Sequence, residues 1–279
     1  MTQLFMHPSI ILALCVAFGA AGIALAAGWL TRSGAAAAAI TGFLVYWLGG
    51  GIAAVPLIAF FVSSSLLTVV GRHRSATKQR ISGQSTGRTG VQVCANGGAA
   101  VVLVVAHKVF GYHITLDMNR MVQIMFLAAI STVTADTWAT EIGSRWGGYA
   151  RQLSTWRKVA AGTSGAISMV GTAAAAAGAL FIPFCAYRLW DMTNAELVAA
   201  AWAGLLGCLF DSILGAGLQA QFRNPNTNEI SDSAVTNGQR NTLIRGLRWI
   251  DNNVVNFIAA IAGALFCWVL LHYGLRRVM

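Results

Sequence analysis

Long apolar runs alternate with short polar segments from one end of the chain to the other. A helix needs about 20 apolar residues to cross a bilayer, and the pattern offers eight candidate spans. These are residues 9–30, 34–52, 54–70, 91–111, 120–139, 163–186, 197–220 and 253–274. Pro56 and the glycine run 49–51 separate the second span from the third. The third is short, so a count of seven stays open, and the pattern predicts an all-α, polytopic membrane helix bundle.

The composition supports this prediction and excludes several other classes. Of the 279 residues, 56% are hydrophobic and 10% are charged, whereas a soluble domain carries about 25% charged residues. The apolar runs continue throughout, so we expect a single integral membrane domain over residues 1–279. The net charge of +10 resides in short loops between spans and not in a nucleic-acid-binding motif, so we expect membrane lipid and no nucleic acid as a partner.

The basic residues are distributed unequally between the two ends of the predicted spans. Residues 31–33, 71–90, 140–162 and 221–252 hold 14 of the 19 Lys and Arg. The positive-inside rule places these segments in the cytoplasm and both termini outside. Most of the acidic residues fall on the same side. No transit peptide is evident, so we expect a prokaryotic plasma membrane with the polar chemistry facing the cytoplasm.

Two carboxylates, five residues apart, lie near the end of the fifth span. Asp136 succeeds a long apolar run, where a carboxylate is costly unless it is paired, hydrated or bound to a metal. Asp136 and Glu141 are about 140° apart around a regular helix. They share one ion only if the helix ends or unwinds near Gly143. An interfacial cap or an ion pair with Arg145 is the alternative.

Asp211 is the acidic residue set most deeply in an apolar span. Asp211, Gly215 and Gln219 repeat every four residues and share one helix face. The glycine leaves this face bare, so that a ligand or another helix can come close. A functional carboxylate and a structural ion pair are both open.

Amides and a further carboxylate stand at two other span entries. Gln92 and Asn96 share a face just after the most basic loop, where they either contact a ligand or join helices. Asp251, Asn253 and Asn256 open the last span, where such groups suit Mg²⁺ or phosphate. N-capping explains one of them.

Basic and hydroxyl groups supply candidate phosphate contacts. The loop 71–90 carries Lys78 and Arg88, which shield anionic substrate in one interpretation and touch lipid headgroups in the other. Thr163 and Ser164 open a span, where backbone N–H groups can bind phosphate, with tight helix packing as the alternative. No P-loop, protein-kinase or zinc-protease motif is present.

Six short motifs in order along the chain resemble those of the DUF92 membrane family, which includes transmembrane protein 19 and a plant chloroplast phytyl-phosphate kinase. They are Ser63–Ser65 with Lys78, Arg88–Gly97, Ala135–Gly143, Gly162–Gly165, Leu209–Gly215 and Asp251–Asn256. Thr89 stands where the family usually has Asp or Asn, and Thr140 where Ser is frequent. Neither departure removes a carboxylate.

The resemblance implies a nucleotide-dependent polyprenyl-phosphate kinase. Such an enzyme converts an isoprenoid monophosphate, such as phytyl or geranylgeranyl phosphate, to the diphosphate with Mg²⁺ and ATP or CTP. In the resulting hypothesis, Mg²⁺ and with it the nucleotide are bound by Asp136, Glu141, Asp211 and Asp251. Lys78 and Arg88 shield the charge of the phosphates. The phosphates are contacted by Gln92, Asn96, Thr163, Ser164, Gln219, Asn253 and Asn256.

Other function classes remain open at this stage. An ion-coupled transporter also uses buried carboxylates and glycine-broken helices, although its site lies near the bilayer midplane. A prenyl-alcohol kinase or a lipid-phosphate cytidylyltransferase needs similar metal and phosphate groups. The sequence also leaves open whether the chain forms a homo-oligomer.

Overall fold

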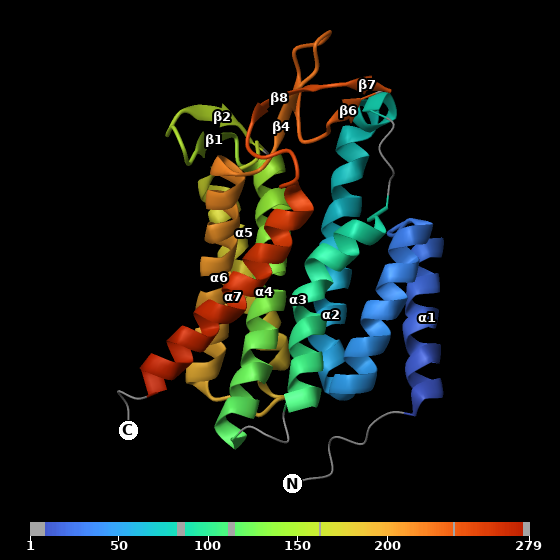
Figure 1. The fold of residues 1–279 in the computed structure, drawn as a ribbon, viewed down its shortest axis with the longest axis vertical. Helices are drawn as coiled ribbons and strands as arrows, with labels where there is room; N and C mark the ends of the chain where they lie inside the picture. Colours follow the sequence, from blue (N-terminus) through green and yellow to red (C-terminus); the bar gives the residue numbers. More distant parts are fainter. Residues whose placement is uncertain (1–8, 83–86, 111–114, 162, 237, 276–279) are drawn as a thin grey trace.

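The protein is a bundle of long helices with small β-strands gathered at one end (Figure 1). The computed structural model describes residues 9–82, 87–110, 115–161, 163–236 and 238–275. Its helices are α1 (Ile10–Ala26), α2 (Arg32–Ser82), α3 (Gly90–Phe110), α4 (Leu116–Trp146), α5 (Met169–Tyr187), α6 (Asn194–Gly217) and α7 (Asn252–Leu275). In this described part, six helices are long and apolar enough to cross a bilayer, and α1 is a shorter apolar helix.

The helix α2 consists of two arms that the chain traverses in opposite directions (Figure 1). Gly50 interrupts it with φ 76° and ψ 179°, a conformation that glycine adopts without a steric penalty. The predicted break between the second and third spans is therefore confirmed. When residues 32–49 and 51–82 are counted as separate arms, the described chain contains the eight helical segments expected from the hydrophobic pattern.

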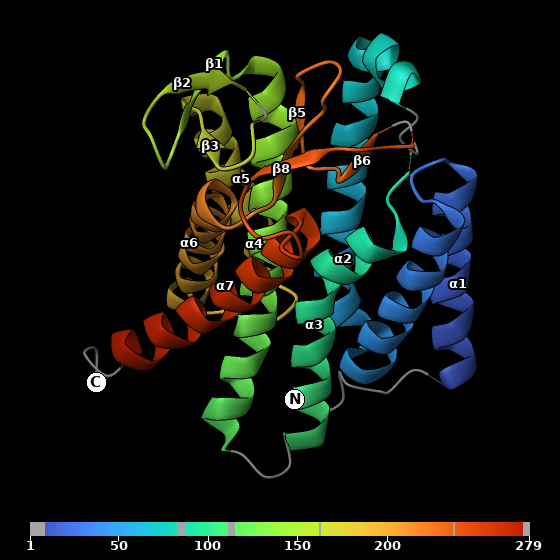
Figure 2. The ribbon, with the colours of Figure 1, turned by 45° about the horizontal axis from the view of Figure 1, so that its top comes forward.

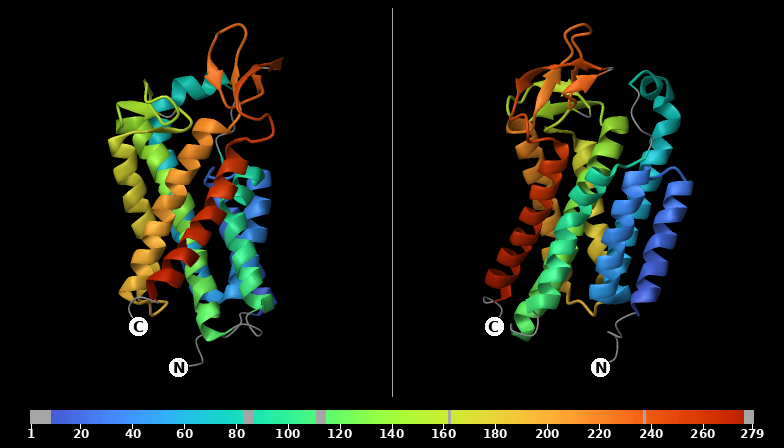
Figure 3. Two further views of the ribbon diagram at one scale, coloured as in Figure 1. Left: turned by 60° about the vertical axis from the view of Figure 1, so that its left-hand side comes forward. Right: turned by 45° about the vertical axis from the view of Figure 1, so that its right-hand side comes forward.

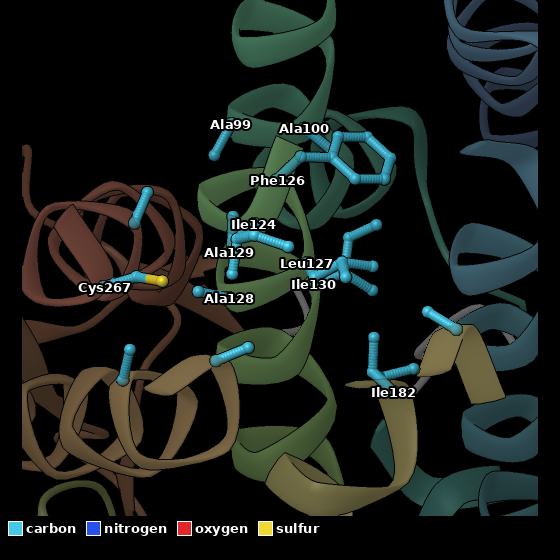
Figure 4. Close-up of a cluster of buried hydrophobic side chains, with 14 of the residues drawn as sticks. Ala99, Ala100, Ile124, Phe126, Leu127, Ala128, Ala129, Ile130, Ile182 and Cys267 are labelled. Carbon is cyan, nitrogen blue, oxygen red and sulfur yellow. The ribbon is translucent and has the colours of Figure 1, made fainter. Parts of the chain in front are cut away.

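The helix α4 occupies the middle of the bundle and contacts α2, α3, α5, α6 and α7. Its residues Ile124, Leu127 and Ile130 are completely or almost completely buried. Figure 4 shows them next to Ile182 of α5 and Cys267 of α7. A helix that buries apolar residues on all sides lies inside a domain, so α4 is the element on which the others pack.

Glycines let α6 and α7 approach α4 closely. A Cβ atom on Gly204 would lie 2.5 Å from the Cβ atom of Ser131, and one on Gly207 or on Gly263 would overlap Thr132. Small residues permit such approach where helices pack in a membrane. The helices α4 and α6 run in the same direction (Figure 1). Asp211 lies one turn after Gly207 on α6, and Asp136 lies one turn after Thr132 on α4, so the contact of Gly207 with Thr132 brings the two aspartates to the same level.

Short antiparallel strands cover the end of the bundle at which α4 and α6 end (Figure 2). One sheet has the order β2-β1-β3, a second has β5-β4-β8, and β6 pairs with β7. The strands are β1 (Tyr149–Gln152), β2 (Lys158–Ala160), β3 (Ala166–Ile167), β4 (Gln221–Arg223), β5 (Ile230–Ser231), β6 (Val235–Thr236), β7 (Gln239–Arg240) and β8 (Thr242–Arg245). The predicted helical bundle is confirmed, but the sequence pattern did not predict these strands, which lie in the polar segments.

The described parts of the four basic segments meet at this same end, while α1 begins and α7 ends at the opposite one (Figure 3). This gathering agrees with the lopsided charge of the sequence. Which compartment the end faces remains a prediction from the positive-inside rule.

The glycine packing gives a first prediction. We expect Gly207→Ala to lower the free energy of unfolding by about 1–3 kcal/mol, because its Cβ atom would overlap Thr132. Gly217→Ala on the same helix is the matched control, since nothing lies within 4 Å of an added Cβ there. Thermal unfolding in detergent measures both, and adding Thr132→Ala should restore part of the loss. Equal effects of the two glycine variants would contradict the packing account.

Candidate functional site

Asp136 of α4 and Asp211 of α6 line one cavity of about 180 Å³ between the helices and the strands β1 and β3. The two carboxylates lie close enough to interact electrostatically. Asp211 is buried and Asp136 is half-buried. Among the described residues, no Lys, Arg or His forms an ion pair with either one. A buried carboxylate without a counter-ion is costly, so the cavity favours a bound cation.

The groups around the two carboxylates fit a hard divalent cation. Hydroxyls of Thr140, Thr163 and Ser212 line the same cavity, and oxygen ligands are those that Mg²⁺ prefers. No three His, Cys, Asp or Glu side chains of the described residues are grouped as a metal site. Asp136 and Asp211 are the two lining carboxylates on facing helices, and Asp232 is a third at the cavity, near Arg245. One or two carboxylates are typical of Mg²⁺ sites that take their remaining ligands from water and substrate phosphates.

The segment that precedes α5 forms one wall of this cavity. Gly165 has φ 71°, and a Cβ atom there would overlap the backbone of Ala216 at the end of α6. The Ser164 hydroxyl donates to Gln219 Oε1 at 2.8 Å. Gln152 of β1 donates to the Ser164 carbonyl at 3.2 Å. These contacts hold the wall against the end of α6. Because α6 ends at Gly217, Gln219 lies beyond the helix on which it was predicted to share a face with Asp211 and Gly215.

Gln219 brings a buried donor to the cavity. Its side chain is 1% exposed, and its amide nitrogen has no hydrogen-bond partner among the described residues. A buried donor without an acceptor costs about 1–3 kcal/mol. Because Gln219 lines the cavity, a bound anion with oxygen acceptors, such as phosphate, would remove this cost.

The first turn of α5 faces the same space. Ser168 caps the helix by accepting a hydrogen bond from Gly171 N–H at 3.1 Å. Ser168, Gly171 and Thr172 all line the cavity. The amino end of a helix carries partial positive charge and attracts anions. The cavity therefore combines an acidic side, suited to a cation, with donors suited to an anion.

Asp232 lines the cavity, and Gln152 and Arg245 hold its wall, but the sequence marked none of the three as a site residue. Arg245 of β8 donates to the carbonyls of Gly215 at 2.8 Å and Ser164 at 3.4 Å. Partial burial at the cavity raises the pKa of Asp232, and the nearby guanidinium of Arg245 opposes this rise. All three reach the site through short strands and loops, whose sequence pattern carried no signal beyond their polarity.

A chain of amides connects α3 and α7 with Asp211. The Asn256 side chain lies 3.1 Å from Asn96 Oδ1. With its amide turned so that nitrogen faces α6, Asn256 donates to Asp211 Oδ2 at 3.3 Å and to the Asn252 carbonyl at 2.8 Å. Asn252 itself lines the cavity. The amides of Asn96 and Asn256 thus join α3 to α7 next to Asp211.

Glu141 does not join the two aspartates. Its carboxylate accepts from the Thr68 hydroxyl at 2.7 Å and pairs with Arg145 at 2.5 Å. It is absent from the cavity lining. The helix α4 continues unbroken to Trp146, so the separation of about 140° between Asp136 and Glu141 is kept. The prediction that both hold one ion was wrong, and the ion pair with Arg145 is found instead.

Asp251 and Asn253 lie at the same end of the bundle but outside the cavity lining. Asp251 accepts from Val254 N–H at 2.9 Å and from the Asn253 amide at 3.1 Å. This is the geometry of an N-cap of α7. The expected four-carboxylate centre is therefore reduced to Asp136 and Asp211, because Asp251 caps a helix and Glu141 is engaged elsewhere.

The predicted basic contacts are separate from the aspartate cavity. Arg88 donates to the Ser65 hydroxyl at 2.9 Å, and it lines a second, apolar cavity together with Gln92 and Asn96. Gln92 Oε1 accepts from Thr89 N–H at 2.9 Å at the start of α3. The side chain of Lys78 lies outside the described residues.

Comparisons with known proteins identify relatives in plants, archaea and cyanobacteria. A family model described as "Integral membrane protein DUF92" matches residues 15–264. "Protein PGR" of Arabidopsis thaliana is 29% identical over 241 residues, 79% of this chain and 83% of the relative. "Protein VTE6, chloroplastic", also of Arabidopsis thaliana, is 24% identical over 251 residues, 89% of this chain and 67% of the relative. An uncharacterized membrane protein of Methanocaldococcus jannaschii is 29% identical over 187 residues, which cover 67% of this chain and 74% of the relative. No solved structure matches.

The cap geometry yields a second prediction. We expect Asp251→Ala to destabilise the protein by about 1 kcal/mol, because α7 loses its N-cap. Asp251→Ser should keep most of the stability, since serine caps helices about as well as aspartate. Thermal unfolding of both variants in detergent tests this. A serine variant as unstable as the alanine variant would show that the carboxylate charge at Asp251 has another role.

Proposed function

Because the chain belongs to the DUF92 family of integral membrane proteins, we propose that it is an Mg²⁺-dependent phosphotransferase that converts an isoprenoid monophosphate to the diphosphate. Phytyl and geranylgeranyl phosphate are the model acceptors, and ATP or CTP is the donor. The reaction takes place at the cytoplasmic face of a prokaryotic plasma membrane. This activity is the one that the motif resemblance to the plant phytyl-phosphate kinase implies.

One observation carries the proposal: two buried carboxylates without a basic partner face donors that suit an anion. Asp136 and Asp211 form the acidic side of the cavity. Gln219 and the amino end of α5 form the other side. A metal-bound polyphosphate carries both kinds of charge, positive at the metal and negative at the phosphates. It therefore matches both sides of the cavity at once.

The location suits a nucleotide more than a carried ion. Asp211 lies six residues before the end of α6 at Gly217, which is fewer than two helical turns. The strand-bearing segments 149–167 and 221–245, which carry several Lys and Arg residues, cover that end (Figure 2). Transporters centre their sites near the bilayer midplane, whereas a nucleotide must enter from water.

The proposed reaction needs little acid–base chemistry. A phosphate oxygen of the acceptor forms a bond to the γ-phosphorus of the nucleotide. The bond from that phosphorus to the β–γ bridging oxygen breaks, and the nucleoside diphosphate leaves with the electron pair. Since the acceptor is already an anion at neutral pH, no strong general base is required. The protein must instead position the phosphates and stabilise their charge.

The groups in and around the cavity have different roles in this scheme. Asp136 and Asp211 would hold Mg²⁺, which would neutralise charge at the transferred phosphoryl group. The Gln219 amide and the first N–H groups of α5 orient phosphate oxygens. Ser164 holds Gln219 in place through its hydroxyl. Arg245 holds the wall and the end of α6 together through two backbone carbonyls.

The proposal predicts loss of turnover when either aspartate loses its charge. We expect Asp136→Asn and Asp211→Asn to lower kcat/KM by about 100-fold or more, because each removes charge stabilisation at the reacting phosphates. The assay follows ATP- or CTP-dependent conversion of geranylgeranyl phosphate in nanodiscs, with product analysis. Asp191→Asn at the opposite end of the bundle is the isosteric control and should retain wild-type turnover.

Product identity separates the related activities. A diphosphate supports the proposal. A CDP-lipid as product, or a monophosphate made from the prenyl alcohol, would replace it with a cytidylyltransferase or an alcohol kinase. Solute flux in proteoliposomes without nucleotide, abolished by the same two substitutions, would replace it with a transporter.

A third measurement concerns the cation alone. Mn²⁺ or Mg²⁺ at 100 times its Kd should stabilise the purified protein by about 2.7 kcal/mol. We expect Asp136→Asn and Asp211→Asn to abolish this gain and Glu141→Gln to keep it, since Glu141 is paired with Arg145. Thermal unfolding with and without cation provides the measurement. If only Glu141→Gln abolished the stabilisation by the cation, the metal would bind at Glu141 and not between Asp136 and Asp211.

A further inference from the structure

A second cavity lies among α1, the two arms of α2 and α3, and nothing in the proposed phosphoryl transfer uses it. Its volume is about 130 Å³, and its lining is almost entirely apolar. Ala17, Ala21 and Ala24 of α1 are buried against it. We call it the α1–α3 cavity.

This cavity opens toward the bilayer. Val16 of α1 and Ile58 of α2 both line it, and their side chains are 39% and 51% exposed. The helix α1 packs against α2, at one side of the bundle (Figure 3). In a membrane chain such exposed apolar side chains face lipid tails, so a hydrocarbon chain can enter sideways without crossing water.

One end of the cavity is polar and cationic. Arg88 just before α3, and Gln92 and Asn96 in its first two turns, line this part of the cavity. The Arg88 guanidinium carbon lies 5.9 Å from the ring centre of Phe60 and 5.8 Å from that of Phe61. The aromatic rings attract the guanidinium and hold its charge beside the apolar lining. The cavity is thus apolar along its length and complementary to an anion at one end.

The polar end adjoins the aspartate cavity. Asn96 lines the α1–α3 cavity and contacts Asn256, which in turn lies 3.3 Å from Asp211. Only two amide side chains therefore separate the polar end of one cavity from a carboxylate of the other. A phosphate at Arg88 and Asn96 would stand beside the nucleotide site.

We infer that the α1–α3 cavity binds the hydrocarbon chain of the isoprenoid monophosphate, with its phosphate held at Arg88 and Asn96. This inference rests on the proposed function for the identity of the ligand. It adds the place where the ligand lies and the side from which it enters.

A third cavity, of about 300 Å³, is the competing place for the chain. It lies at the opposite end of the bundle and contains Arg120. That guanidinium is already paired with Glu196 at 2.6 Å and donates to the carbonyls of Trp190 and Asp191. Its charge is therefore compensated within the protein, and it is remote from Asp136 and Asp211.

Gly42 offers a way to shorten the α1–α3 cavity without disturbing its walls. It lines the cavity, and a Cβ atom there would meet only Ala17 within 4 Å, at an ordinary 3.7 Å. Gly22→Leu is the matched control, because Gly22 of α1 is exposed and an added Cβ would meet nothing within 4 Å. Both changes replace a helical glycine by the same good helix former.

We expect Gly42→Leu to weaken binding of geranylgeranyl phosphate about tenfold or more, because the added side chain occupies space that the long chain needs. Binding of the five-carbon dimethylallyl phosphate should change little, and Gly22→Leu should bind both as the wild type does. The measurement is equilibrium binding of the radiolabelled lipids to the detergent-solubilised protein, without nucleotide. Thermal unfolding without ligand verifies that each variant is folded.

Photolabelling provides a test that depends on no substitution. A geranylgeranyl phosphate analogue with a diazirine at the far end of its chain should label peptides of α1 and α2, in competition with geranylgeranyl phosphate. Labelling around Arg120 would overturn the inference. The inference would also be overturned if Gly42→Leu bound both lipids as tightly as the wild type does. The same holds if the folded variant lost affinity for both lipids equally.

The two proposals fail in different ways. If geranylgeranyl phosphate binds in the α1–α3 cavity but no diphosphate forms with ATP or CTP, the reaction is wrong and the binding site stands. If the diphosphate forms and Gly42→Leu leaves the chain-length preference of turnover unchanged, the reaction stands and this binding site is wrong.

Discussion

The electrostatic cost of two neighbouring carboxylates inside a helix bundle governs the rest of this structure. Asp136 and Asp211 repel each other where water is scarce, and no described basic side chain pairs with either. The two ion pairs that the described chain does form, at Glu196 and Glu141, compensate other acidic residues. The arrangement therefore favours either a proton on one of the two carboxyl groups or a cation in the cavity.

The close packing of helices produces this arrangement. Gly207 rests on Thr132, and the next turn of each helix brings Asp211 and Asp136 to the same cavity. A larger side chain at Gly207 would separate α6 from α4 and with them the two carboxylates. Helix packing and the charge site are consequently one feature, since the glycine that permits the approach also sets the spacing of the aspartates.

The sequence was sufficient for those features that follow from the bilayer. Apolar length predicted the helices, the glycine run predicted the break at Gly50, and the cost of burial singled out Asp136 and Asp211. Glu141 was misplaced because nothing in the sequence shows that α4 continues past Gly143. Gln152 and Arg245 were missed because their positions depend on strands of two to four residues, which carry little periodicity.

The junction between the two cavities is neutral, and this has a chemical consequence. Asn96 and Asn256 join α3 to α7 by an amide contact, and the second amide reaches Asp211. A lysine or arginine at position 256 would place a positive charge beside Asp211 and compete with the cation of the proposed reaction. An amide holds the helices and orients oxygen ligands while it leaves the charge of Asp211 intact. In the proposed reaction, this neutral junction would keep Arg88 apart from the acidic cavity, so that opposite charges act on different phosphates of the two substrates.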